Sequence, residues 1–144
     1  MKAAVVVANE DVQYQEVEEP QVTPGHVKIK VRYSGICGSD IPRVLNHGVH
    51  FYPIVLGHEF SGIVIETGEA VTTVSVGDHV AMDPNLYCGK CLPCRMGKKQ
   101  NCEHLSALGV TRDGGFAEYA VCPESQCFVV NKEIDFVVAA MAEP

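Results

Sequence analysis

The sequence has no run that approaches the roughly 20 consecutive apolar residues of a membrane-spanning helix. Its first apolar stretch, residues 1–8, ends at Asn9-Glu10-Asp11, which is too early for a secretory signal peptide. The seven cysteines are an odd number, which does not suit a framework of paired disulfides. Together these features predict a protein of the reducing cytoplasm with no membrane partner.

Positive charge is also scarce. Eleven lysines and arginines stand against 18 acidic residues, for a formal net charge of −7, which argues against nonspecific binding to nucleic acid. No strand is followed by a GxGxxG turn and a helix, and the run from Gly109 to Gly115 does not match that pattern. We therefore expect no dinucleotide-binding unit within these 144 residues.

What the sequence does have is a dense group of cysteines, three of them at CxxCxxC spacing. Two residues between ligands let a tight turn aim both sulfurs at one ion, and the group is interleaved with glycine and proline. Four thiolates leave no open position for water. The spacing therefore predicts structural Zn²⁺, held in a lobe of about residues 86–104, with the ligands Cys88, Cys91, Cys94 and Cys102.

Other interpretations of this group are two disulfides or an iron–sulfur cluster. The usual cluster run continues with three residues and then Cys-Pro, whereas seven residues precede Cys102 and no proline follows it. A zinc ribbon that binds nucleic acid is a further alternative, because Arg95, Lys98 and Lys99 lie beside the cysteines, but no aromatic residues are interleaved there. A zinc hydrolase is disfavoured because no HExxH motif occurs.

A second, dispersed set of possible ligands consists of Cys37, His58, Glu59 and Glu143. Each is a weak signal alone, since an isolated cysteine is more often a small residue of the core. Taken together, a thiolate, an imidazole and a carboxylate suit a catalytic zinc, which needs about three protein ligands and one open position.

The secondary-structure signals are mostly those of strands. Apolar and charged residues alternate from Val27 to Tyr33, with the period of two of a half-buried strand. Many short strands with Gly and Pro turns between them favour a β-barrel or sandwich. We expect one short helix near 39–45, a helical segment that begins near Ile134, and a longer polypeptide beyond Pro144. Further strands are expected at 2–7, 60–66, 78–82, 115–121 and 127–130.

Several motifs occur together in one order. They are Cys37-Gly-Ser-Asp40, Gly57-His-Glu-Phe-Ser-Gly62, Gly77-Asp-His-Val80, the four-cysteine lobe and Gly114-Gly-Phe-Ala-Glu-Tyr119. Through them the whole chain resembles the zinc-dependent medium-chain alcohol dehydrogenases. Runs at 39–43, 50–58 and 112–118 look most like those of galactitol-1-phosphate dehydrogenases, within the polyol and polyol-phosphate branch. Sorbitol and threonine dehydrogenases are also similar.

The resemblance implies that residues 1–144 form a GroES-like catalytic domain, mainly β, with a partly open barrel, a zinc lobe and a few short helices. In the family a Rossmann domain that binds NAD or NADP follows, and it lies outside this chain. The implied activity is oxidation of a secondary alcohol of a polyol or polyol phosphate to a ketone, with two zinc ions and in a homo-oligomer. Sorbitol and threonine are alternative substrates, and we expect this chain alone to be inactive.

The same resemblance assigns roles to individual residues. Cys37 and His58 would bind the catalytic zinc, Glu59 would be a ligand or a reserve ligand, and Glu143 would reach the metal or hold its water. Ser39 would take the proton of the substrate. Asp40 would fix the tautomer of His58, although Ser39 and Asp40 also suit a helix cap.

Two residues are candidates for contact with the substrate. Many relatives place a histidine two or three residues after this aspartate, where the present sequence has Pro42 and Arg43, so the exit path of the proton stays open. Arg43 is predicted to face a phosphate, which guanidinium binds in a bidentate manner, or else to be an ordinary exposed arginine. Tyr52 is predicted to line the substrate pocket, with simple packing as the alternative.

Overall fold

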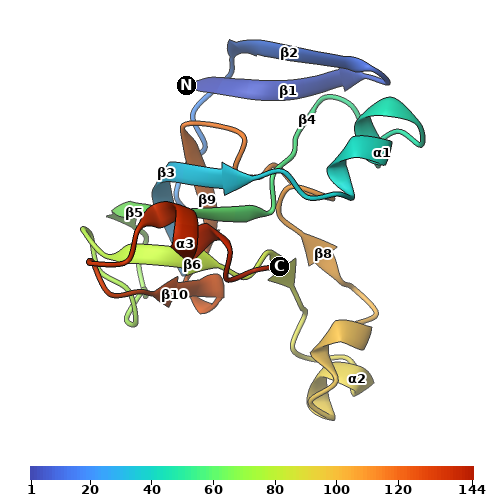
Figure 1. Ribbon diagram of the computed structural model, residues 1–144. Helices are drawn as coiled ribbons and strands as arrows, with labels where there is room; N and C mark the ends of the chain where they lie inside the picture. The colour runs from blue at the N-terminus through green and yellow to red at the C-terminus, as the bar shows by residue number, and fades with distance from the viewer.

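A computed structural model describes residues 1–144, and most of its regular structure is β (Figure 1). The strands are β1 (Lys2–Ala8), β2 (Asp11–Glu16), β3 (His26–Gly35), β4 (Ile54–Val55), β5 (Glu59–Thr67), β6 (His79–Met82), β7 (Asn85–Leu86), β8 (Ser106–Ala107), β9 (Tyr119–Pro123) and β10 (Cys127–Val129). The helices are α1 (Asp40–Leu45), α2 (Leu92–Arg95) and α3 (Phe136–Ala140), with 3-10 turns η1 (Lys99–Asn101) and η2 (Glu124–Gln126). None of these helices is both long and apolar enough to cross a membrane.

The central sheet is antiparallel and has the order β10-β6-β5-β3-β9. Its inner face carries the main core, because successive side chains of a strand point to opposite faces and the apolar residues alternate. Within β3, Val27 and Ile29 are fully buried, as the alternation predicts. Ile29 pairs with Val64 of β5 on one side and with Ala120 of β9 on the other, which ties three strands to one core.

Two residues of β3 depart from the predicted alternation. Tyr33 is exposed, because the register between β3 and β5 shifts between Val31 and Tyr33. Lys28 is buried, because its ammonium group lies 2.9 Å from Glu19 and 3.2 Å from Glu66. These carboxylates raise the pKa of Lys28 and keep its charge compensated, and the hydrogen bond that Lys28 donates to Glu19 has the largest effect.

A smaller sheet, β2-β1-β4, lies at the top of the view in Figure 1. Strand β2 was not predicted, because its apolar side chains Val12 and Tyr14 are both exposed and give it no buried face. The strand predicted at 115–121 is displaced to β9, at 119–123. Residues 114–116 instead bond to the backbone of Val55, Leu56 and Gly57.

Helix α3 lies across the central sheet, where it contacts β3, β5 and β6 (Figure 1). Asp135 caps it by accepting a hydrogen bond from the Val137 N–H at 2.8 Å. The buried Ser61 hydroxyl of β5 donates to the Phe136 carbonyl at 2.6 Å and fixes the helix to the sheet. Beyond the helix, Glu143 lies near Met82 of β6 and Phe128 of β10, with which it lines a cavity.

The segment between β7 and β8 forms a separate lobe, which projects from the end of the molecule opposite β1 and β2 (Figure 1). It contains α2 and η1 and coincides with the predicted cysteine lobe. The prediction of a mainly β, partly open barrel with few short helices is confirmed.

Candidate metal centres and active site

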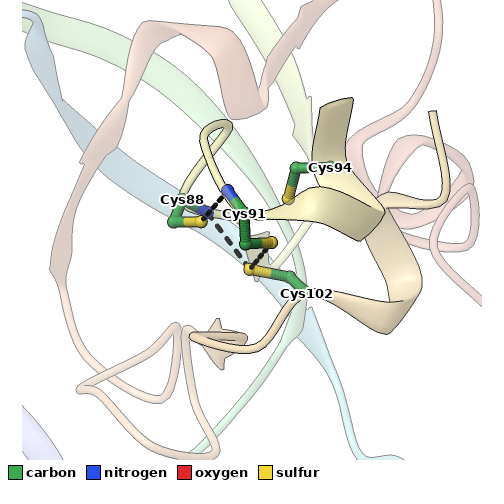
Figure 2. A group of neighbouring side chains, drawn as sticks. All are labelled: Cys88, Cys91, Cys94 and Cys102. Atoms are coloured by element: carbon green, nitrogen blue, oxygen red, sulfur yellow. Dashed lines mark hydrogen bonds between the residues drawn. The ribbon is translucent and has the colours of Figure 1, made fainter. Parts of the chain in front are cut away.

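The four cysteines of the lobe point at one another (Figure 2). Their sulfur atoms all lie within 4.8 Å of one another, and all four are free thiols. Cys88 precedes the turn, Cys91 and Cys94 flank the start of α2, and Cys102 follows η1. Gly89 and Gly97 have positive φ values of 70° and 78°, so glycine permits the two turns that bring the sulfurs together.

Backbone N–H groups surround these sulfurs. Cys102 Sγ accepts hydrogen bonds from Cys88 N and His104 N, both at 3.3 Å, and Cys88 Sγ accepts one from Cys91 N at 3.4 Å. The N–H groups of Lys90 and Cys91 lower the pKa of Cys88 to about 6, which favours its thiolate. Burial, and then the neighbouring Cys91 and Cys102, raise the pKa of Cys94 to about 12. Four soft donors with N–H support fit a Zn²⁺ ion.

A second group comes from two parts of the chain. Cys37 follows β3, His58 precedes β5, and Glu59 begins β5. Their potential ligand atoms also lie within 4.8 Å of one another, and His58 and Glu59 are buried. A thiolate, an imidazole and a carboxylate here fit a divalent ion that keeps an open position.

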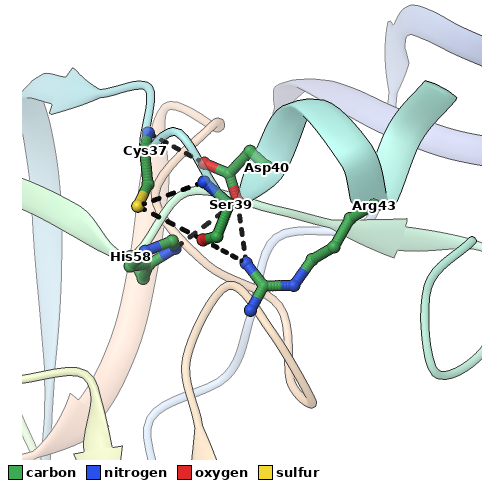
Figure 3. Close-up of polar contacts among 5 residues, drawn as sticks. All are labelled: Cys37, Ser39, Asp40, Arg43 and His58. Atoms are coloured by element: carbon green, nitrogen blue, oxygen red, sulfur yellow. Dashed lines mark hydrogen bonds and ion pairs between the residues drawn. The ribbon is translucent and has the colours of Figure 1, made fainter. Parts of the chain in front are cut away.

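Asp40 connects this group to α1 (Figure 3). Its Oδ2 accepts a hydrogen bond from Cys37 N at 3.1 Å, and its Oδ1 lies 3.5 Å from His58 Nδ1. The second contact is longer than an ordinary N–H···O hydrogen bond, and Nδ1 is a buried polar atom without a bonded partner. Burial raises the pKa of Asp40, an effect that the His58 and Arg43 charges oppose.

Ser39 and Arg43 complete the cluster in Figure 3. The Ser39 hydroxyl donates to Cys37 Sγ at 3.2 Å, and its oxygen accepts from Arg43 Nη1 at 2.7 Å. Arg43 Nη1 also lies 3.4 Å from Asp40 Oδ1. Although Ser39 stands at the N-cap of α1, its side chain makes no capping hydrogen bond. The hydroxyl is therefore directed toward the cysteine rather than toward the helix.

Glu143 lies outside the group formed by Cys37, His58 and Glu59. It lines a cavity of about 310 Å³ with Met82 and Phe128. Burial raises the pKa of Glu143, the His58 charge opposes this shift, and the charge of Glu59 adds to it. The pKa of Glu143 therefore responds to the charges of two residues of the dispersed group, although Glu143 is not among the residues whose ligand atoms lie within 4.8 Å of one another.

Tyr52 is 41% exposed, and its hydroxyl accepts a hydrogen bond from Val49 N at 3.4 Å. None of its hydrogen bonds reaches the cluster around Cys37.

Gly35 and Ser61 were not singled out from the sequence. Gly35 faces Glu59 across β3 and β5, and Ser61 anchors α3, which leads to Glu143. Ser61 stands in the motif Gly57–Gly62, which was the only signal for it.

Comparisons with known proteins agree with this geometry. Residues 23–132 match the model of the alcohol dehydrogenase GroES-like domain. The sorbitol dehydrogenase of Halalkalibacterium halodurans is 41% identical over 147 residues, which cover 100% of this chain and 43% of that protein.

Three solved structures share the fold. The galactitol-1-phosphate dehydrogenase of Escherichia coli has a TM-score of 0.94 at 37% identity, over 98% of this chain and 41% of that one. The rspB alcohol dehydrogenase of E. coli CFT073, complexed with NADH, has a TM-score of 0.91 at 40% identity, and the match covers 98% of this chain and 41% of that one. A cobalt- and zinc-bound alcohol dehydrogenase of Pyrobaculum aerophilum has a TM-score of 0.88 at 36% identity, and the match covers 97% of this chain and 44% of that one.

The chain spans less than half the length of each of these proteins. The family match covers most of the chain and includes the cysteine lobe and the group around Cys37 and His58. The resemblance seen in the sequence motifs is therefore confirmed, and the chain belongs to the alcohol dehydrogenase GroES-like domain family.

Proposed function

We propose that this chain is the zinc-binding catalytic domain of an NAD(P)-dependent alcohol or polyol dehydrogenase, which oxidises a secondary alcohol to a ketone. The observation that carries the proposal is the convergence of Cys37, His58 and Glu59 beside the Ser39 hydroxyl. The dehydrogenases named above support it. Each of them is more than twice as long as the matched region, and we assign the nicotinamide cofactor to a further part of the protein.

Cys37, His58 and Glu59 are the proposed ligands of a catalytic zinc, with Glu143 as a nearby carboxyl that reaches the metal or its water. His58 Nδ1 faces Asp40 Oδ1 at 3.5 Å, which leaves Nε2 as the nitrogen for the metal, and a hydrogen bond from Nδ1 to this carboxylate would fix the tautomer once the metal is bound. When bound, zinc supplies Lewis-acid chemistry that favours deprotonation of an alcohol hydroxyl. The four cysteines of the lobe hold a second, structural zinc.

Ser39 is the proposed acceptor of the substrate proton. Its position next to Cys37 Sγ puts the hydroxyl at the edge of the ligand group. Arg43 Nη1 donates a hydrogen bond to Ser39 Oγ. A guanidinium group stays protonated in proteins, so it neither releases nor accepts a proton. Arg43 therefore orients Ser39 without relaying its proton, and the proton leaves by another path.

The substrate class follows from the free part of Arg43. Only Nη1 makes hydrogen bonds, and the side chain is 28% exposed, so the remaining edge of the guanidinium is open to an anion. We assign a polyol phosphate as the substrate, with unphosphorylated sorbitol-like or threonine-like substrates as the alternative. Tyr52 is retained as a second contact to the substrate, and a homo-oligomer in the cytoplasm is the expected form.

The test uses the longer protein that contains this chain, loaded with zinc. Reduction of NAD⁺ or NADP⁺ should be measured with polyols and polyol phosphates as substrates, together with the zinc content. Ser39→Ala should lower kcat while two zinc ions remain bound, since Ser39 is not a ligand. No oxidation of any secondary alcohol by the fully loaded protein would contradict the proposed function.

A further inference from the structure

Two cysteines lie outside both ligand groups and have no part in the proposed reaction. Cys122 is on β9 and Cys127 begins β10, and their sulfur atoms are 3.3 Å apart. In the central sheet β9 and β10 are the two opposite edge strands. The thiol pair therefore lies where the curled sheet brings its two edges together.

The backbone between the two cysteines is held in place. Residues 124–126 form the η2 turn, in which Glu124 binds the N–H groups of Thr72 and Thr73. The Gln126 carbonyl accepts a hydrogen bond from Asp83 N at 3.0 Å. Because both ends of this short connection are fixed, the two sulfurs are kept in contact rather than meeting only by chance.

The two thiols differ in access to solvent. Cys122 has no exposed surface and packs against the Met82 sulfur at 3.9 Å, within the main core. Cys127 is partly exposed, and its thiol lies 3.7 Å from the Pro123 carbonyl. A reagent from solvent therefore meets Cys127 first, and Cys122 is the second thiol behind it.

We propose that Cys122 and Cys127 are a redox modification site, at which a hydroperoxide or a small-molecule disulfide converts the two thiols into a reversible intramolecular disulfide. With hydrogen peroxide, the Cys127 sulfur attacks a peroxide oxygen, the O–O bond breaks, and a sulfenic acid and water form. The Cys122 sulfur then attacks the Cys127 sulfur and displaces a second water. The two thiols lose two electrons and two protons in total, and the peroxide is reduced to two waters.

With a small disulfide such as oxidised glutathione, Cys127 first forms a mixed disulfide and releases one thiol. Cys122 then attacks the Cys127 sulfur and releases the second thiol, so that two small thiols are produced for each protein disulfide. The bond joins the edge strands β9 and β10 covalently. Reduction by an excess of a small thiol restores both cysteines.

The experiment exposes the zinc-loaded full protein to oxidised glutathione, then unfolds it in denaturant, blocks all free thiols by alkylation, and analyses tryptic peptides without reduction. Arg112 and Lys132 flank a single tryptic peptide that contains both cysteines. The expected product is this peptide without any alkyl group and lighter by two hydrogen atoms. Treatment with dithiothreitol before alkylation should return it to the doubly alkylated form.

Two variants test the proposed order of reaction, in which Cys127 reacts first and Cys122 second. Cys122→Ala should stop at a stable glutathione adduct on Cys127, whereas Cys127→Ala should leave Cys122 unmodified. Far-UV circular dichroism and zinc content check that each variant is folded. The proposal is overturned if both cysteines stay fully alkylated, or if Cys127 pairs with a cysteine of the lobe instead of Cys122.

Discussion

Gly35 and Glu59 are directly opposite each other in the β3–β5 ladder, and the Glu59 carboxylate fills the space that a side chain at position 35 would take. A Cβ atom on residue 35 would overlap Glu59 Oε2 and lie only 3.2 Å from Glu59 Cβ. The glycine thus allows the carboxylate to fold back beside Cys37 and His58. This contact links the register of two strands to the geometry of the proposed catalytic site.

Gly35→Ala should therefore displace the Glu59 carboxylate and weaken metal binding at the catalytic site, while the lobe keeps its zinc. Substitutions that disturb the orientation of a metal ligand typically cost about 10–100-fold in metal affinity, and we expect a loss in that range. Metal-binding titration by competition with a chelator would measure it. Gly38→Ala is the matched control, because nothing lies within 4 Å of a Cβ at that position. Equal affinities for the two variants would contradict the role of Gly35.

The two proposed zinc sites should differ in their response to a chelator. The lobe offers four thiolates that close around the ion, whereas Cys37, His58 and Glu59 leave one side open. Catalytic zinc should be removed first, followed by the lobe zinc only under harsher conditions. Elemental analysis of the protein at increasing chelator concentrations would show two separate steps. A single step that removes both ions together would argue against the assignment.

Cys91→Ser should remove the lobe zinc and unfold the lobe locally. Structural zinc contributes roughly 10–16 kcal/mol of apparent binding free energy in zinc-finger peptides, so loss of one of four ligands is costly. Zinc content should fall by one ion, and proteolysis between residues 86 and 104 should accelerate. Cys127→Ser is the matched control, since Cys127 is outside both ligand groups and should leave both zinc ions in place.

Glu124 should make stability depend on pH. Its carboxylate accepts hydrogen bonds from Thr73 Oγ1 at 2.7 Å, Thr73 N at 2.8 Å and Thr72 N at 2.9 Å, and these bonds lower its pKa below the ordinary 4.5. A lowered pKa in the folded state stabilises the protein above the unfolded-state pKa, and this contribution is lost as the pH falls through the folded-state pKa. Glu124→Gln should lower the Tm at pH 7.

The difference in Tm between Glu124→Gln and the parent protein should shrink as the pH is lowered below 4.5. The parent carboxylate then becomes protonated, so that position 124 is uncharged in both proteins. Glu133→Gln is the matched control, since the side chain of this exposed glutamate makes no hydrogen bond. A Tm difference that stays constant from pH 7 to acid pH would contradict the role assigned to the carboxylate.

The lobe was predictable from the sequence because its ligands are local. All four cysteines lie between positions 88 and 102, so their spacing alone restricts the geometry. In the dispersed group, Cys37 is brought to His58 only by the pairing of β3 with β5, which no local pattern encodes. The family motifs identified these residues, but the space that Gly35 leaves for Glu59 depends on strand register.

The errors in the prediction of the fold have similar causes. Alternation located β3, but two acidic side chains from other segments made burial of Lys28 possible. Strand β2 was missed because Tyr14 is 76% exposed and the strand is held through backbone pairing with β1. Hydrophobic periodicity detects strands that bury one face, so an exposed edge strand escapes it.

The direction of the Arg43 side chain also could not be predicted from the sequence. This direction is the basis of the last prediction. Arg43 turns back from α1 to Ser39 and Asp40, as Figure 3 shows, although the sequence allowed a fully exposed arginine. Its removal should therefore have two effects in the longer, zinc-loaded protein. The Ser39 oxygen loses the donor that orients it, and the proposed phosphate loses a cationic partner.

Arg43→Ala should raise KM for a polyol phosphate more than for the free polyol, while kcat falls for both substrates. A hydrogen bond to a charged group contributes about 1.5–3 kcal/mol, which corresponds to an increase in KM of roughly 10–150-fold for the phosphate alone. Arg43→Lys keeps the charge but not the planar fork, so it should recover part of the KM effect and less of the kcat effect.

Arg95→Ala is the matched control for charge, because Arg95 lies on α2 in the lobe, away from Ser39. It should leave both parameters unchanged. If KM rises equally for the phosphorylated and free substrates, the guanidinium does not contact a phosphate, and its contribution is limited to holding Ser39. If kcat is unaffected in Arg43→Ala, the 2.7 Å contact to Ser39 does not orient the hydroxyl during the reaction.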